Sequence, residues 1–129
     1  MTKSKLLIFA FMIAGSILFA QSIDAPMISA DAAREMLSSE KNALLIDVRT
    51  HDEFVSKHIP GATLLPSGEI TQDSALRVLG SDLDRIIIVY CASGGRSKSS
   101  ASLLLSFGYK NVWNMGGLSV WPFSTVKGE

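Results

Sequence analysis

The stretch 86–97 constrains the fold of this chain more than any other part of the sequence. It begins with three isoleucines and Val89, a β-branched and apolar run that is typical of a strand buried on both faces of a parallel sheet. The run ends at Cys91, and Gly94 and Gly95 follow, so the backbone can curl there with its N–H groups pointing inward. The stretch therefore predicts a central strand, a short anion-binding loop and the start of a helix.

Cys91 is the only cysteine of the chain and sits at the floor of this predicted loop. A free cysteine has a pKa of about 8.5, so only a small fraction is thiolate at neutral pH. The loop amides, the N-terminus of the following helix and Arg96 all favour the charged form, and a fall of about two pKa units would make it the majority species. The sequence predicts a sulfur nucleophile in an anion pocket, whereas the cysteine taken without its loop could equally be an inert buried residue.

Strand and helix patterns alternate along the rest of the chain. Further strands are predicted at 27–28, 43–48, 62–64 and 111–113, and helices at about 29–37, 50–57, 69–79 and 97–107. Ser29 is a predicted helix cap, and Thr50 with Glu53 a predicted capping box. The pattern implies one α/β domain over residues 26–124, with a five-stranded, mostly parallel sheet flanked by helices on both faces. Ligands in such sheets bind beyond the carboxyl ends of the strands, where Asp47 and Cys91 are predicted to lie.

The loop and two further segments resemble the rhodanese family of sulfurtransferases. The loop residues that match are Tyr90-Cys91-Ala92-Ser93-Gly94-Gly95-Arg96-Ser97. The family's first signature is matched by Asp47-Val48-Arg49, Glu53-Phe54 and His58-Ile59-Pro60-Gly61-Ala62, and its closing segment by Phe107-Gly108-Tyr109, Asn111-Val112, Met115-Gly116-Gly117-Leu118 and Trp121. The similarity covers residues 27–122, with Lys57 standing where a glycine usually precedes the histidine.

The resemblance implies a single-domain thiosulfate sulfurtransferase, similar in plan to the small periplasmic rhodaneses of bacteria. Cys91 would take sulfane sulfur from thiosulfate or a similar anionic donor, hold it as a persulfide, and pass it to a thiophilic acceptor such as cyanide or a thiol. No external cofactor is needed, because the sulfur is carried on the protein. The predicted substrate-binding residues are Arg96, Ala92, Ser93, Gly94, Gly95 and Ser97.

Several other residues are predicted to have structural roles. Asp47 and Arg49 are interpreted as an ion pair or loop support, and His58, at the turn before a proline, as a structural histidine rather than a general base. Gly116-Gly117 is expected to let the backbone approach the active-site side of the sheet. With two histidines and one cysteine, none at ligand-like spacing, no metal site is predicted.

Two other classes of function remain open. Some phosphatases share the rhodanese fold, and they and arsenate reductases use a cysteine–arginine loop. The tyrosine-phosphatase pattern has five residues between cysteine and arginine, whereas here there are four, and Tyr90 rather than a histidine precedes Cys91. The third interpretation is a sulfur-carrier or regulatory module that binds a partner without turnover. The intact cysteine and loop oppose a degenerate module but leave such a carrier open.

Residues 1–20 are predicted to be a signal peptide. Lys3 and Lys5 precede an uncharged run from Leu6 to Ala20, which has the length of a signal-peptide core and is short for a membrane span of about 20 residues. An uncleaved membrane anchor is the alternative. The protein is therefore expected to be exported, to the periplasm in a cell that has one. The protein is expected to be a monomer, and the 12 basic and 12 acidic residues of the full sequence give no reason to expect a nucleic-acid partner.

Overall fold

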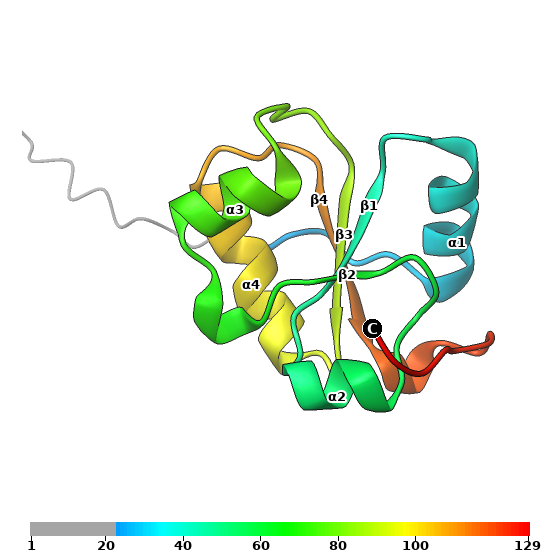
Figure 1. Ribbon diagram of the computed structural model, residues 1–129. Helices are drawn as coiled ribbons and strands as arrows, with labels where there is room; N and C mark the ends of the chain where they lie inside the picture. Colours follow the sequence, from blue (N-terminus) through cyan, green and yellow to red (C-terminus); the bar gives the residue numbers. More distant parts are fainter. Residues whose placement is uncertain (1–22) are drawn as a thin grey trace, which may run out of the picture.

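A four-stranded parallel sheet forms the centre of the computed structural model, which describes residues 23–129; the predicted signal peptide lies outside the described residues. The strands are β1 (Leu44–Asp47), β2 (Thr63–Leu64), β3 (Ile87–Cys91) and β4 (Val112–Gly117), in the order β2-β1-β3-β4 (Figure 1). Ile88 of β3 lies opposite Leu45 of β1 on one side and Trp113 of β4 on the other. The strand that leads to the cysteine is therefore paired along both of its edges.

Four α-helices surround this sheet. They are α1 (Ala30–Ser39), α2 (His51–Ser56), α3 (Gln72–Leu79) and α4 (Gly95–Ser106), and two 3-10 turns cover Ser67–Glu69 and Leu118–Val120. α1 covers one face of the sheet, α3 and α4 cover the other, and α2 lies at the carboxyl ends of the strands (Figure 1). The predicted α/β fold, with a parallel sheet between helices, is confirmed. Within residues 23–129, none of the helices has both the length and the apolar character that crossing a membrane requires.

The first predicted strand, at residues 27–28, is reduced to a single bridge, so the expectation of five strands needs correction. Met27 bridges Asn114 of β4, with hydrogen bonds from the Ile28 N–H to the Asn114 carbonyl (3.0 Å) and from the Asn114 N–H to the Pro26 carbonyl (2.9 Å). The pairing cannot extend further, because Pro26 has no N–H to donate and Ser29 already caps the next helix.

Local capping chemistry sets where the helices begin. The Ser29 side chain accepts the N–H of Ala32 (3.1 Å), and Thr50 with Glu53 forms the predicted capping box of α2. The third helix begins at Gln72 rather than near residue 69, because Thr71 and Ser74 form a second capping box there. Residues 67–69 instead form a 3-10 turn.

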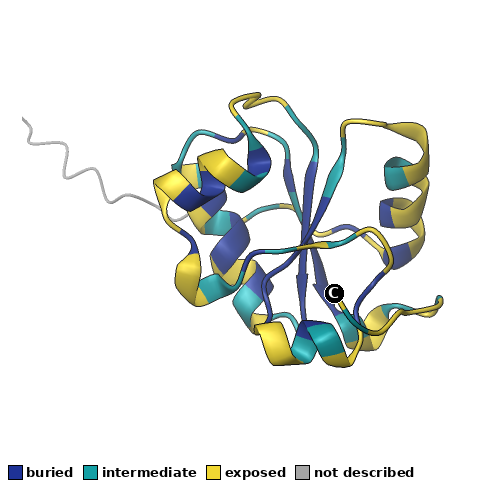
Figure 2. Cartoon of the chain, viewed as in Figure 1, coloured by how far each residue is buried: buried dark blue, intermediate teal, exposed yellow. Residues whose placement is uncertain are grey.

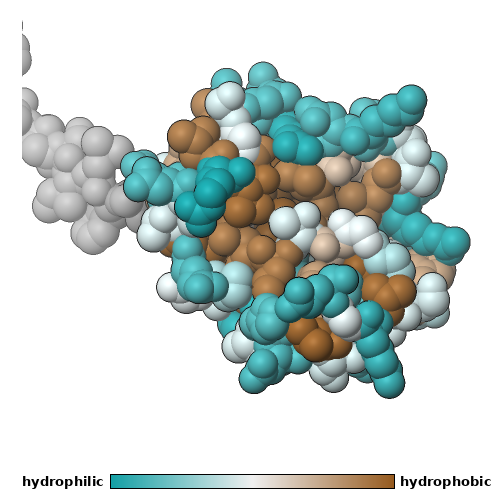
Figure 3. Space-filling model, in the orientation of Figure 1, coloured by the Kyte–Doolittle hydropathy of each residue, from teal (hydrophilic) through white to brown (hydrophobic). Residues whose placement is uncertain are grey.

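The apolar core has two layers, one on each face of the sheet. Alternate residues of β3 enter different layers, with Val89 and Cys91 facing α3 and α4, and Ile88 and Tyr90 facing α1. Every residue of β3 is buried, and the buried class is concentrated along the strands in Figure 2. In the space-filling view, hydrophilic side chains rim the molecule and apolar ones gather near the middle of the face that carries the edge strand β2 (Figure 3).

The C-terminal residues return to the strand ends. His58 and Val126 form an antiparallel bridge with two backbone hydrogen bonds of 2.9 Å, and the Gly128 N–H donates to the Val55 carbonyl (2.9 Å). The end of the chain consequently packs against α2 and the residues that follow it (Figure 1).

A buried ion pair holds β1 to the end of α2. Asp47 is fully buried, and the Arg49 guanidinium donates to its carboxylate through Nη2 (2.7 Å) and Nε (3.0 Å). The same Nη2 donates to the Lys57 carbonyl (2.6 Å), and the Arg49 N–H donates to the Asp47 carboxylate (2.9 Å). Desolvation by burial is the largest single influence and lowers the pKa of Arg49, but the hydrogen bond and charge of Asp47, together with smaller contributions from Tyr90, outweigh it and raise that pKa.

Replacing Arg49 with methionine should destabilise the fold strongly, because Asp47 would be left as a buried charge without its partner. We expect a loss of about 3–5 kcal/mol in the free energy of unfolding, measured by urea denaturation. Arg77→Met, at an exposed position of α3, is the matched control and should change stability by no more than about 0.5 kcal/mol. Equal effects of the two substitutions would contradict the structural role of the pair.

Candidate active site

Cys91 is the last residue of β3, and its side chain lies inside the turn that leads into α4. Gly94 has a φ of 109°, in the left-handed region that favours glycine. Its backbone N–H donates to the Cys91 sulfur, with 3.0 Å between the nitrogen and Sγ. The helix begins at Gly95, two residues earlier than expected from the sequence. The turn therefore consists of only three residues, and the sulfur lies between it and the first turn of α4.

The surroundings of Cys91 lower the pKa of its thiol. Burial alone would raise that pKa, but hydrogen bonds from the Ser97 side chain and backbone, and from the N–H groups of Gly94 and Ser93, outweigh burial. The sequence had indicated loop amides, the helix N-terminus and Arg96 as the cause. It had not indicated the hydroxyl of Ser97, because serine at the start of a helix is an ordinary residue without a visible partner in the sequence.

The Ser97 hydroxyl is fully buried and lies 3.5 Å from the Cys91 sulfur. It donates to the carbonyl oxygens of Gly94 (3.0 Å) or Gly116 (3.3 Å), and it can accept the thiol proton of Cys91. A hydroxyl carries a single proton, so the same group can turn that proton towards the sulfur once the thiol ionises. Ser97 thus supports both protonation states of the nucleophile.

The end of β4 packs directly against the active-site turn. A bulge in the β3–β4 pairing, stabilised by the Gly116 N–H donating to the Asn114 side chain (2.9 Å), brings Gly117 opposite Cys91. A Cβ atom at Gly117 would overlap the carbonyl oxygen of Ala92 and lie 2.7 Å from the Ser93 Cα. The close approach expected at Gly116-Gly117 is present, and only glycine fits at position 117.

Arg96 extends from the first turn of α4 towards α2. Its Nη1 and Nη2 atoms donate to Oε1 (2.7 Å) and Oε2 (3.0 Å) of Glu53. Hydrogen bonding to Arg96 lowers the pKa of Glu53 to about 2, and the hydrogen bond to Glu53 raises the pKa of Arg96. The residue predicted to bind the donor thus already holds a carboxylate, a pairing that the sequence reasoning did not anticipate.

The remaining predicted site residues lie behind the loop or at the surface. Asp47 and Arg49 form the buried ion pair already described. His58 is buried, stacks on Phe54 with ring centroids 3.7 Å apart, and its Nδ1 lies 2.9 Å from the Phe54 carbonyl oxygen. The other histidine, His51, is not a predicted site residue and is exposed beside Glu129. Within residues 23–129, no three His, Cys, Asp or Glu side chains gather in an arrangement that could hold a metal ion.

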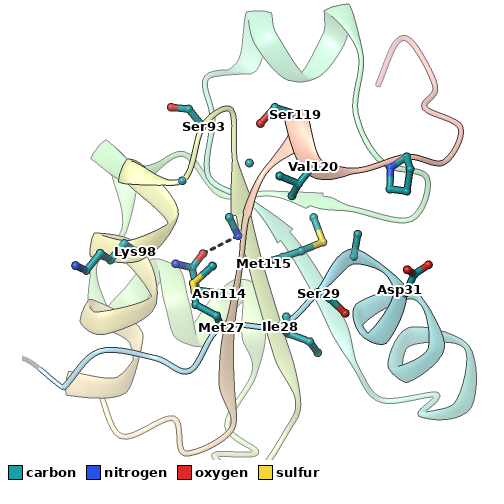
Figure 4. A pocket seen from close by; sticks show the side chains of 15 residues that line it. Met27, Ile28, Ser29, Asp31, Ser93, Lys98, Asn114, Met115, Ser119 and Val120 are labelled. Atoms are coloured by element: carbon teal, nitrogen blue, oxygen red, sulfur yellow. Dashed lines mark hydrogen bonds between the residues drawn. The ribbon is translucent and has the colours of Figure 1, made fainter.

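Two open cavities flank the active-site turn. One, of about 740 Å³, lies between the starts of α1 and α4, with Ser93 and Ser119 at one end, Lys98 on the α4 side and Asp31 on the α1 side (Figure 4). The other, of about 590 Å³, is lined by Ser67, Gly68, Gly95, Arg96, Ser99, Ser100 and Leu103. Arg96 therefore borders open space as well as Glu53.

Comparisons with known proteins agree with this geometry. The profile of the rhodanese-like domain matches residues 29–122. The chain is 35% identical to the thiosulfate sulfurtransferase GlpE of Pseudomonas savastanoi pv. phaseolicola, covering 69% of this chain and 85% of that protein. It is 33% identical to a sulfurtransferase of Allochromatium vinosum, over 73% of this chain and 85% of that protein. A solved structure described as rhodanese with anions from E. coli is similar with a TM-score of 0.60 and 32% identity, over 67% of this chain and 99% of that one.

The fold, the cysteine turn and these matches place the chain in the family of rhodanese-like domains, as the sequence motifs had indicated. Its relatives include sulfurtransferases that align over most of both chains.

Ser97→Ala should raise the pKa of Cys91, because the thiolate would lose one hydrogen bond to a charged group. A bond of that kind contributes about 1.5–3 kcal/mol, which corresponds to about one to two pKa units. In the variant, the rate of Cys91 alkylation by iodoacetamide, followed by intact mass across a pH range, should therefore reach its plateau at a higher pH and fall by roughly threefold or more at pH 7. Ser99→Ala, at an exposed position of the same helix, should leave the profile unchanged; a shift in both variants would exclude a specific role of the Ser97 hydroxyl.

Gly117→Ala should displace the active-site turn, because the added methyl group would overlap the backbone of Ala92. We expect a fall in stability of about 1–3 kcal/mol together with slower alkylation of Cys91 at pH 7, as the Gly94 N–H moves away from the sulfur. The control is Gly68→Ala, where an added Cβ meets no atom within 4 Å. Wild-type alkylation in Gly117→Ala would show that the turn does not need this contact.

Proposed function

We propose that this protein is a sulfurtransferase that carries sulfane sulfur as a persulfide on Cys91. The observation that supports this most directly is the Cys91 sulfur in its turn, with a Gly94 N–H at 3.0 Å and a thiol pKa lowered by hydrogen bonds. Sulfur transfer needs a thiolate nucleophile and a site that accommodates an anionic sulfur compound, and this turn offers both.

The first half of the proposed reaction loads the protein. The Cys91 thiolate attacks the outer sulfur of thiosulfate or a similar donor and forms a sulfur–sulfur bond. The bond between the two sulfur atoms of the donor breaks, and sulfite leaves with the electron pair. The N–H groups of Ser93 and Gly94 and the hydroxyl of Ser97, which lower the pKa of the thiol, would also stabilise the charged persulfide.

The second half returns the thiolate. A thiophilic acceptor, such as cyanide or a thiolate, attacks the outer sulfur of the persulfide, and the bond to Cys91 breaks with its electron pair remaining on Cys91. The two half-reactions share one site and one covalent intermediate, so ping-pong kinetics are expected. The reaction as proposed uses no cofactor.

The geometry favours sulfur transfer over phosphate-ester hydrolysis. A phosphatase loop must wrap around a tetrahedral phosphate, but here the turn spans only Ala92 to Gly94 before α4 begins. A sulfur carrier that is loaded but does not turn over uses the same thiol, and the experiment below distinguishes it.

We also propose that the protein is exported. This proposal rests on the sequence of residues 1–20, with two lysines before an uncharged apolar run. The mass of the purified protein tests it, since a processed chain lacks the mass of this segment and an uncleaved anchor retains it.

The proposed function is tested by intact mass of the protein before thiosulfate, after thiosulfate, and after subsequent cyanide. We expect a gain of one sulfur atom, its removal by cyanide, and no gain in Cys91→Ser. Loading without repeated turnover would indicate a carrier. Absence of loading at near-neutral pH, with the thiol shown to be free, would contradict sulfur transfer from this donor class.

A further inference from the structure

We propose that Glu53 sets the donor selectivity of the active site by acting as a tethered anion, which an anionic sulfur donor must displace from Arg96. The inference deepens the proposed sulfurtransferase function and rests on it for the identity of the donor.

The pair joins two elements that meet at the mouth of the site. Glu53 belongs to α2 and Arg96 to the first turn of α4, 43 residues later in the chain. Nη1 donates to Oε1 (2.7 Å) and Nη2 to Oε2 (3.0 Å), so the carboxylate occupies the face of the guanidinium formed by its two terminal nitrogens. A sulfonate or sulfate-like donor presents oxygens that suit the same fork, so donor and carboxylate compete for one cation.

The carboxylate is held in place independently of Arg96. Its Oε1 accepts the Thr50 N–H (3.3 Å) and the Thr50 hydroxyl (3.1 Å), as part of the capping box that starts α2. The helix is anchored in turn by the buried Phe54 and by the bond from Arg49 to the Lys57 carbonyl. When Arg96 turns away, Glu53 therefore stays where it is and remains available to recapture the guanidinium.

The exposure of the pair makes exchange feasible. The side chains of Arg96 and Glu53 are 37% and 35% exposed, whereas those of Arg49 and Asp47 are 5% and 0% exposed. Exposed ion pairs contribute only about 0.2–1 kcal/mol, so an incoming anion can replace one at little cost. Arg96 also lines the cavity of about 590 Å³, so there is open space beside this residue for an incoming anion.

Because Glu53 occupies Arg96 for part of the time, the apparent affinity for an anionic donor is its intrinsic affinity multiplied by the fraction of time that Arg96 is free. Glu53→Gln should relieve this competition, since glutamine keeps the capping-box geometry but carries no charge to hold the guanidinium. We expect the KM for thiosulfate to fall by about two- to fivefold, the factor that corresponds to one exposed ion pair. If Glu53 instead holds Arg96 in the orientation that binds the donor, the KM should rise.

A second measurement on the full chain does not depend on sulfur transfer. The rate of Cys91 alkylation by anionic iodoacetate, divided by the rate with neutral iodoacetamide, reports how strongly the site attracts an anion. The ratio should rise about two- to fivefold in Glu53→Gln and fall in Arg96→Met. Glu53→Gln should raise it by less when Arg96 is already methionine, because only the direct repulsion by the carboxylate is then removed. Asp52→Asn removes the same charge from the neighbouring, fully exposed position of α2 and serves as the matched control.

The outcomes separate this inference from the proposed function. An unchanged or lower ratio in Glu53→Gln, or an equal rise in Asp52→Asn, would overturn the role of Glu53 even if the protein loads sulfur. A rise specific to Glu53→Gln, without sulfur loading by the wild type, would support the tethered anion and contradict thiosulfate as the donor. If Glu53→Gln does not fold, two measurements on Arg96→Met decide: its ratio of iodoacetate to iodoacetamide alkylation, and how far added sulfate protects Cys91 from alkylation. Displacement of Glu53 requires that Arg96 can bind anions. A ratio and a sulfate protection equal to those of the wild type would mean that it does not, and would overturn the proposal.

Discussion

The position of the active site depends on how firmly β3 is held within the sheet and the core. This strand is paired on both edges and buried on both faces, so a slip of one residue would exchange its two sets of side chains between different core layers. Its last residue is Cys91, which means that the sheet, rather than a flexible loop, determines where the sulfur lies. The turn that follows is short because α4 begins at Gly95 and because Gly117 lets β4 close against it.

The helix α2 connects two arginines that have different physical roles. Arg49 joins buried Asp47 to the carbonyl at the end of this helix, in an ion pair shielded from water. Arg96 forms an ion pair with Glu53, which lies in the first turn of α2, and water and solutes can reach this pair. The first arrangement fixes the helix on the sheet, and the second uses the fixed helix to present a charge to the active site. Both pairs join a carboxylate to a guanidinium. Because the Asp47–Arg49 pair is buried it stabilises the fold, whereas the exposed Glu53–Arg96 pair can exchange with an anion.

The elements that could be predicted from the sequence are those governed by local chemistry. The apolar run before Cys91, the cap at Ser29 and the capping box at Thr50 depend on neighbours a few residues away, and all three are present. The prediction of a strand at residues 27–28 was wrong, because Pro26 and the following cap limit the pairing to a single bridge. Its partner, β4, is also distant in the sequence, so no local pattern indicates how far the pairing extends. The contact of Glu53 with Arg96 and the Ser97 hydrogen bond to Cys91 depend on how separate elements pack, which no local pattern specifies.

The single buried cysteine has a consequence for how sulfur can leave the protein. Many thiol enzymes clear an oxidised or derivatised cysteine by attack from a second cysteine of the same chain. Here Cys91 is the only one, and its residue is 1% exposed. A sulfur atom bound there has no internal exit, so its residence time is set by encounter with an outside nucleophile small or flexible enough to reach the turn. The protein would hold one sulfur atom per chain and release it at a rate governed by the acceptor.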